Sequence, residues 1–369
     1  MIMRPFCISV VVISLFFAVL APAGAVATRD IEAVRAKKVL DDADLRTIDA
    51  FVAQAAGEIL ATDDFSSISG IRSIILANSA SSQPGQVQFA EQFSESSKKH
   101  IAAALQTADG LTPPDRSFKV ITNLLMLLDG LADLRLVDLP LKYVDSENRV
   151  ISYWAVNCLT NPKIIEGLNS SKEPDVARKI CRRLGEAVAT NSPRTLGLIA
   201  AFAGSVTISD GEDLLLEVAD RRITSYADWS VQYELLDGTI LQLLCDKMDS
   251  SDPRRAAVAQ RFGQLFSYVF QRYLKGDNLL SAAQKQQLAS VLVETEKSCL
   301  SRLTGRPSSD IKKAIESSDR DALLREHNNL LGDAARPGQL VTEINFDYGK
   351  AADGSPLKSP LPLADAPKS

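Results

Sequence analysis

Prolines at the starts of apolar helical segments are the feature that most restricts how this chain can fold. Each follows a residue that caps a helix or tolerates an extended backbone, in the pairs Asn161-Pro162, Glu173-Pro174, Ser192-Pro193 and Asp252-Pro253. Proline suits the first position of a helix because its missing N–H would have no intrahelical partner there. The links between these helices are short, and short links force neighbouring helices to lie antiparallel. The pattern therefore predicts helical hairpins.

Apolar residues recur at intervals of three and four along most of the chain, which is the period of an amphipathic helix. One such stripe runs from Ile31 through Val39 to Ile59. Leucine and alanine supply most of the apolar residues, and aromatic residues make up only 6 % of the chain, which also favours helices over sheets. We expect further helices over residues 65–79, 86–106, 116–133, 175–190, 194–206, 212–223, 231–248, 254–274, 281–303 and 319–331.

These patterns predict an all-α fold in which helical hairpins stack as an α-solenoid, with a compact multi-helix bundle as the alternative. The predicted regions are an N-terminal helical region at 28–135, a helical-repeat region at 136–333 and a tail at 334–369. The tail is rich in proline, glycine and serine, and we expect it to be extended or disordered. Residues 341–346 have the composition of a strand, but the chain offers them no partner strand.

The stretch from Leu139 to Gly185 contains two similar units. Residues 145–148 suit a turn between helices, and a hydrophobic–small–hydrophobic spacing follows at Ile151, Ala155 and Leu159. The spacing recurs at Val176, Ile180 and Leu184, and a third echo leads from Asp252 to Phe262. About a third of the chain thus resembles helical repeats of the HEAT or armadillo type. This resemblance implies a HEAT-like solenoid that binds a partner along its surface.

The units also depart from the pattern of that family. Ser152 and Ala177 stand where the family often has an arginine. The units are unevenly spaced, whereas the family repeats about every 40 residues.

The first residues indicate the compartment. Arg4 is followed by an apolar stretch from Phe6 to Leu20, and small residues at Ala23, Ala25 and Ala27 suit a signal peptidase. The stretch is short for a membrane span, which takes about 20 apolar residues. We therefore predict a signal peptide at residues 1–27 and a periplasmic or extracellular protein with no membrane span after cleavage. The alternative is an uncleaved N-terminal anchor.

Four cysteines follow the predicted cleavage point: Cys158, Cys181, Cys245 and Cys299. Each lies in an apolar helical pattern, so buried free thiols acting as small hydrophobic side chains are favoured over disulfides. If one disulfide exists, we expect it to join Cys158 and Cys181, which fall on successive core-facing helices.

Candidate catalytic and metal-binding residues are few. The two histidines, His100 and His327, have no carboxylate or histidine at the spacings that place metal ligands on one helix face, so we interpret both as surface or structural residues. The acidic clusters Asp41-Asp42-Ala43-Asp44 and Asp63-Asp64 lack the order of an EF-hand and resemble turns or helix starts. The sequence therefore predicts no catalytic, cofactor-binding or metal-binding residue, and no cofactor.

Two other groups of residues suggest a binding surface. The pairs Arg182-Arg183, Arg221-Arg222 and Arg254-Arg255 would form a basic ridge on stacked hairpins, but we favour solvated arginines beside neighbouring acids. An aromatic contact patch is also conceivable, although we favour core positions for its members, which are Tyr153, Trp154, Tyr226, Trp229 and Tyr233.

The functional hypothesis follows from the fold class. The net charge of −5 and the pI near 5.3 argue against a nucleic-acid binder. We expect an exported, non-catalytic helical-repeat scaffold that binds a protein or an envelope polymer. The alternative is a helical protein that binds a small molecule or an enzyme that uses carboxylates alone.

Overall fold

The computed structural model describes residues 26–171, 174–248, 254–305, 307–350 and 354–367. In these residues the regular elements are helices, and β-type pairing is limited to the isolated bridges Gly332–Pro337 and Lys350–Pro356. The predicted all-α fold is therefore confirmed. No helix in the described part of the chain is long and apolar enough to span a bilayer. The predicted signal peptide, except Val26 and Ala27, lies outside the described residues.

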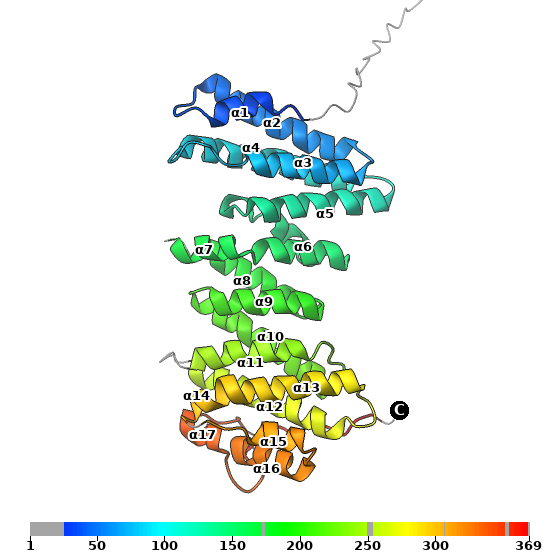
Figure 1. The fold of residues 1–369 in the computed structure, drawn as a ribbon, viewed down its shortest axis with the longest axis vertical. Helices are drawn as coiled ribbons and strands as arrows, with labels where there is room; N and C mark the ends of the chain where they lie inside the picture. The colour runs from blue at the N-terminus through cyan, green and yellow to red at the C-terminus, as the bar shows by residue number, and fades with distance from the viewer. Residues whose placement is uncertain (1–25, 172–173, 249–253, 306, 351–353, 368–369) are drawn as a thin grey trace, which may run out of the picture.

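The helices form two layers that run along an elongated stack (Figure 1). In one layer each helix contacts the next in the order α3 (Phe65–Asn78), α5 (Pro114–Leu131), α6 (Arg149–Leu159), α9 (Pro193–Ser205), α11 (Leu235–Met248) and α13 (Ala282–Thr295). The other layer contains α2 (Asp42–Ala61), α4 (Val87–Asp109), α8 (Asp175–Val188), α10 (Ser209–Ala227), α12 (Arg255–Lys275) and α16 (Arg320–Leu331). The 3₁₀ turns η1 (Leu134–Leu136) and η2 (Pro140–Tyr143) follow α5 in the chain, and they contact α4 and α6, respectively. The stacked hairpins make a solenoid rather than a compact bundle.

The helix starts follow from local sequence. Pro162 begins α7 (Pro162–Ser170) and Pro193 begins α9, each behind a side-chain cap, as predicted. Pro174 is instead the residue just before α8, and Pro253 lies outside the described residues.

Ion pairs join neighbouring elements along the second layer. Lys179 pairs with Asp138, Arg254 with Asp213 and Arg261 with Asp220, and each pair is 41 positions apart. The last two of these pairs join the same helices, α10 and α12, and the Arg183–Asp145 pair has an offset of 38, so the spacing is similar along the layer but not constant. Exposed pairs of this kind contribute little to stability, so we attribute the relative position of the helices to the packing of their apolar faces and not to these ion pairs.

Two expectations are wrong. Val39 is 80 % exposed in the link between α1 (Arg29–Arg35) and α2, so it does not belong to the apolar stripe. Residues 341–344, expected to be extended or disordered with the rest of the tail, are instead helical, because α17 spans Gln339–Ile344. Around α17, the tail has buried residues at Phe346, Tyr348 and Leu363, so its described part is extended and packed and is not disordered. Sequence analysis also missed α15 (Asp310–Glu316) and the π-turn η3 (Glu296–Leu300) that precedes α14 (Ser301–Leu303).

Candidate functional site

The C-terminal strap, residues 354–367, lies along the outer face of α12 at the end of the solenoid (Figure 1). Its sequence alternates proline with leucine, which favours an extended backbone. Leu363 is 1 % exposed and Pro360 is also buried, while Leu361 points to solvent and is 50 % exposed. The strap is thus an extended peptide that inserts some side chains into a groove and leaves others free.

Two glutamines of α12 hold the backbone of the strap. The Gln264 side chain donates from Nε2 to the carbonyl oxygen of Leu361 at 3.1 Å and accepts from its N–H at 2.8 Å. The Gln271 Oε1 accepts from the N–H of Leu363 at 2.7 Å. The two glutamines are seven residues apart on one face of α12, and they contact alternate residues of the strap, Leu361 and Leu363. The contacts are to backbone atoms and do not depend on the leucine side chains.

The next strap carbonyls accept from a cation and an indole. Lys275 Nζ donates to the carbonyl oxygen of Leu363 at 2.6 Å, and Trp229 Nε1 donates to that of Ala364 at 3.1 Å. The Arg272 guanidinium lies 5.3 Å from the centre of the Trp229 ring and is paired with Glu234 at 3.2 Å. The Arg272 guanidinium therefore packs on the indole ring of Trp229, whose N–H binds the strap.

A buried charge network supports the α10–α11 link that carries Trp229. Arg222 binds Asp237 through Nε at 2.6 Å and Nη2 at 2.8 Å, and the Tyr226 hydroxyl donates to the same carboxylate at 2.7 Å. Arg222 is 2 % exposed and Asp237 is fully buried. Burial raises the pKa of Asp237, and the hydrogen bonds from Arg222 and Tyr226 oppose that rise. Arg222 also donates to the carbonyl oxygen of Gln232, which fixes the backbone of the link.

A glycine allows the chain before the strap to approach α12. The ring of Tyr348 lies so close to Gly263 that a Cβ there would be 2.9 Å from its Cε1 atom. Gly263 is in the middle of α12, where glycine costs helix stability relative to alanine. The absence of a side chain makes room for the aromatic ring.

A cavity of about 620 Å³ lies between α12, α16 and the strap, and it opens to solvent. It is lined by Gln271, Leu274, Lys275, Arg320, Asp321, Leu324, His327, Asn328, Gly332, Asp333, Ala334, Ser359, Pro360 and Pro362. His327 and the strap, which are more than 25 residues apart in the chain, therefore line the same cavity.

His327 belongs to a hydrogen-bond chain that resembles part of a hydrolase triad. Its Nε2 lies 2.9 Å from Ser267 Oγ, and its Nδ1 lies 3.0 Å from Asn328 Oδ1. Ser267 is fully buried, and its hydroxyl accepts from Gln271 Nε2 at 2.8 Å, so it is not presented to the cavity as a nucleophile. Burial lowers the pKa of His327. The chain joins α12 to α16, which confirms the structural interpretation of His327.

The other candidate sites of the sequence analysis have local partners. His100 Nε2 lies 2.9 Å from Asp49 Oδ1, which joins α4 to α2. Asp41 forms a capping box with Asp44 at the start of α2, and Asp64 caps α3. The interpretation of both acidic clusters as helix starts is confirmed.

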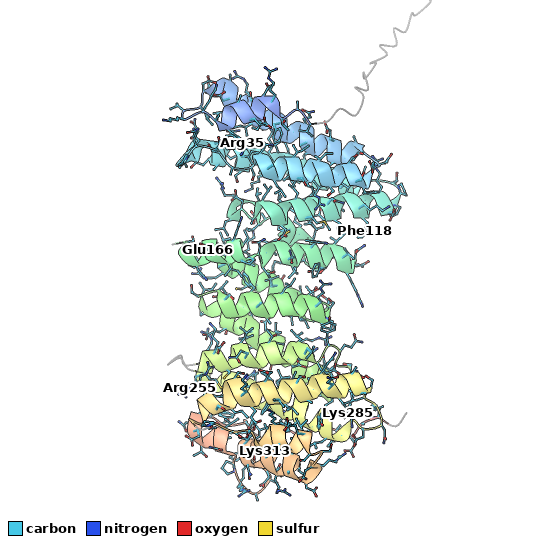
Figure 2. The ribbon with its side chains drawn as sticks, in the orientation of Figure 1. Arg35, Phe118, Glu166, Arg255, Lys285 and Lys313 are labelled. Carbon is cyan, nitrogen blue, oxygen red and sulfur yellow. The ribbon has the colours of Figure 1, made fainter. Side chains whose placement is uncertain are left out.

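The arginine pairs do not form one ridge. Arg183 pairs with Asp145 and Arg254 with Asp213, as expected for arginines beside acids. Arg222 contradicts the solvated interpretation, because its side chain is buried against Asp237. Figure 2 shows Arg255 at the edge of the stack near the start of α12.

The aromatic residues are divided between core and surface. Tyr226 is fully buried, in agreement with the prediction, whereas Tyr233 is 66 % exposed. Tyr153 and Trp154 pack edge to face with their ring centres 5.7 Å apart on α6. Trp229 is the aromatic residue of this group that contacts the strap.

The four described cysteines are buried and free in this structure, as the favoured interpretation expected, and Cys158 and Cys181 are not joined. Cys158 Sγ donates to the carbonyl oxygen of Leu125 at 3.0 Å instead.

The fold and the groove define an all-α protein of stacked helical hairpins whose last hairpins hold an extended peptide. No family model matches this chain, and no curated protein matches it. Among solved structures, the chain is similar to an engineered protein at 11 % sequence identity, with 86 % of this chain and 94 % of that chain covered and a TM-score of 0.22. At these values the likeness carries no argument about function.

Proposed function

We propose that this protein is an exported, non-catalytic helical-repeat scaffold of HEAT-like type, and that its α12 groove binds an extended leucine- and proline-rich segment of a partner protein. The observation that carries the proposal is the strap itself, which occupies the groove as such a peptide would. Gln264 and Gln271 bind backbone groups, so they would bind any extended chain in the same register. Selectivity would come from the pocket that covers Leu363.

The strap acts in this proposal as a competitor that is part of the same chain. A tethered segment has an effective concentration in the millimolar range, so a partner peptide must bind tightly or arrive when the strap is displaced. An exported signal sequence and a mildly acidic surface are consistent with a protein partner rather than a nucleic acid.

The test compares the full chain with a chain that ends at residue 353. A labelled peptide with the sequence of residues 354–367 is titrated into both, and binding is followed by fluorescence anisotropy. We expect saturable binding to the shortened chain and much weaker binding to the full chain. Substitution Gln264→Ala or Gln271→Ala in the shortened chain should weaken binding on the order of tenfold.

Two peptide variants test the recognition mode. An ester in place of the Leu361 amide removes the donor to Gln264 and should weaken binding, while a scrambled peptide should not bind. If the shortened chain retains its helical circular dichroism and does not bind the peptide, the proposal is wrong. If the shortened chain unfolds, the full chain with Leu363→Ala, which loosens the strap, replaces it in the titration.

The cavity of about 620 Å³ supports a second candidate, a small apolar ligand held under the strap. One carboxylate of the cavity, Asp333, accepts hydrogen bonds from the N–H groups of Ala335 and Arg336, which lower its pKa. A lowered pKa makes Asp333 a poor general acid near neutral pH. A ligand that binds the full chain more tightly than the shortened chain would favour this second candidate over the peptide scaffold.

A further inference from the structure

Two of the buried thiols come from neighbouring segments of one layer, because α11 contacts both α13 and the turn η3. Cys245 is on α11 and Cys299 is in the π-turn η3 that follows α13, and both are fully buried. Two hydrogen bonds join the segments that carry these thiols. Cys299 Sγ donates to Gln242 Oε1 of α11 at 3.4 Å, and Arg302 Nη2, three residues after Cys299, donates to Cys245 Sγ at 3.0 Å. Gln242 and Cys245 lie one turn apart on α11, and Cys299 and Arg302 are three positions apart in the chain, so both thiols belong to one cluster of contacts between these segments.

The π-turn explains why Cys299 faces α11. A π-turn inserts an extra residue into a helix and redirects the side chains that follow it. Within η3, Glu296 is 2 % exposed and accepts from the N–H groups of Ile311 and Lys312 at the start of α15, at 2.9 and 3.0 Å. The same turn therefore directs Glu296 toward α15 and Cys299 toward Gln242 of α11.

We propose that Cys245 and Cys299 form a disulfide that links α11 to the π-turn η3. Oxidation removes one proton and one electron from each thiol and joins the two sulfur atoms. A low-molecular-weight disulfide such as oxidised glutathione accepts both electrons and both protons and leaves as two thiols.

The surroundings favour this pair for exchange. Arg302 donates from Nη2 to Cys245 Sγ at 3.0 Å, and its positive charge favours the ionised form of the thiols beside it. Because both side chains are fully buried, the exchange takes place while the chain folds or opens locally. Cys158 hydrogen-bonds to a backbone carbonyl and has no such neighbouring thiol, so it serves as a control.

The experiment refolds the purified full chain from denaturant in mixtures of oxidised and reduced glutathione, followed by thiol alkylation and peptide mapping. We expect the peptides that contain Cys245 and Cys299 to be joined, with the loss of two hydrogen atoms. Reduction should lower the Tm on the order of 5 °C, because the link closes the long loop from residue 245 to residue 299. Cys245→Ala or Cys299→Ala should remove this dependence on reductant, and Cys158→Ala should keep it.

The proposal is overturned if both thiols are alkylated after refolding in excess oxidised glutathione, or if either cysteine is joined to another partner instead. Refolding in vitro tests the pair independently of export. Whether the bond is present in cells rests on the export that is part of the proposed function. Protein isolated from its own cells with free Cys245 and Cys299, but able to form the bond in vitro, would count against export and not against the disulfide.

Discussion

Gln264 binds both the N–H and the carbonyl oxygen of Leu361, a residue 97 positions further along the chain. One amide side chain thus satisfies a whole backbone residue of the strap, as a neighbouring strand would in a sheet. Leu363, two residues further on, supplies the buried side chain, and its N–H makes a third backbone contact, to Gln271. This division between backbone recognition and a single apolar anchor is the basis of the proposed peptide site.

We expect Gln264→Ala to release the middle of the strap. The substitution removes two hydrogen bonds to the half-exposed residue Leu361, and each contributes about 0.5–1.5 kcal/mol. Hydrogen exchange should show faster exchange of the Leu361 amide, with a smaller effect at Leu363. Gln286→Ala, at an exposed position of α13, is the matched control and should leave both amides unchanged. Equal exchange at Leu361 in the two variants would contradict the contact.

A pair of glycine substitutions tests the packing of Tyr348. At Gly57 an added Cβ meets no atom within 4 Å, so Gly57→Ala should stabilise α2 by about 0.5–1 kcal/mol. At Gly263 the same change places Cβ against the buried ring of Tyr348. We expect Gly263→Ala to lower the Tm and Gly57→Ala to raise it in thermal unfolding. A rise of Tm in both variants would mean that the ring yields without cost.

The buried pair is expected to contribute far more to stability than an exposed one. Asp237→Ala leaves the Arg222 guanidinium buried without its carboxylate, and the expected loss is about 3–5 kcal/mol in the free energy of unfolding. Asp213→Ala removes the exposed partner of Arg254 and should cost about 0–1 kcal/mol. Urea denaturation measures both, and similar losses would show that the Arg222 network is not the main support of the α10–α11 link.

Stability is expected to fall as the pH drops below the ordinary pKa of histidine, about 6.5. Burial lowers the pKa of His327 in the folded protein, so the unfolded chain binds a proton more readily between these two pKa values. The stability gained from the neutral ring is therefore complete above about pH 6.5 and is lost as the pH falls toward the folded pKa. Urea midpoints measured from pH 7.5 down to 5 should decrease for the natural chain and less so for His327→Gln. A parallel decrease in both would assign the effect to other groups.

The helices and their hairpin order were predictable from the sequence alone. Helix formation depends on residues three and four positions apart, on caps and on prolines, and these are local features such as Asn161-Pro162 and the Asp41 cap. The sequence also contains an indication of the groove. Gln264 and Gln271 interrupt an apolar stretch of α12, and polar side chains among buried residues need hydrogen-bond partners. The partners themselves, Leu361 and Leu363, had no local signature.

The tertiary structure alone decided which distant segments meet. The strap packs on α12, Arg222 is buried against Asp237, and Cys299 contacts Gln242 of α11. The sequence predicted an extended or disordered tail and a solvated arginine, and it did not show which segment lies beside Cys299. Each of these contacts depends on how successive hairpins stack and on where the π-turn directs its side chains. Short-range periodicity fixes which face of a helix is apolar, but it does not determine which remote segment covers that face.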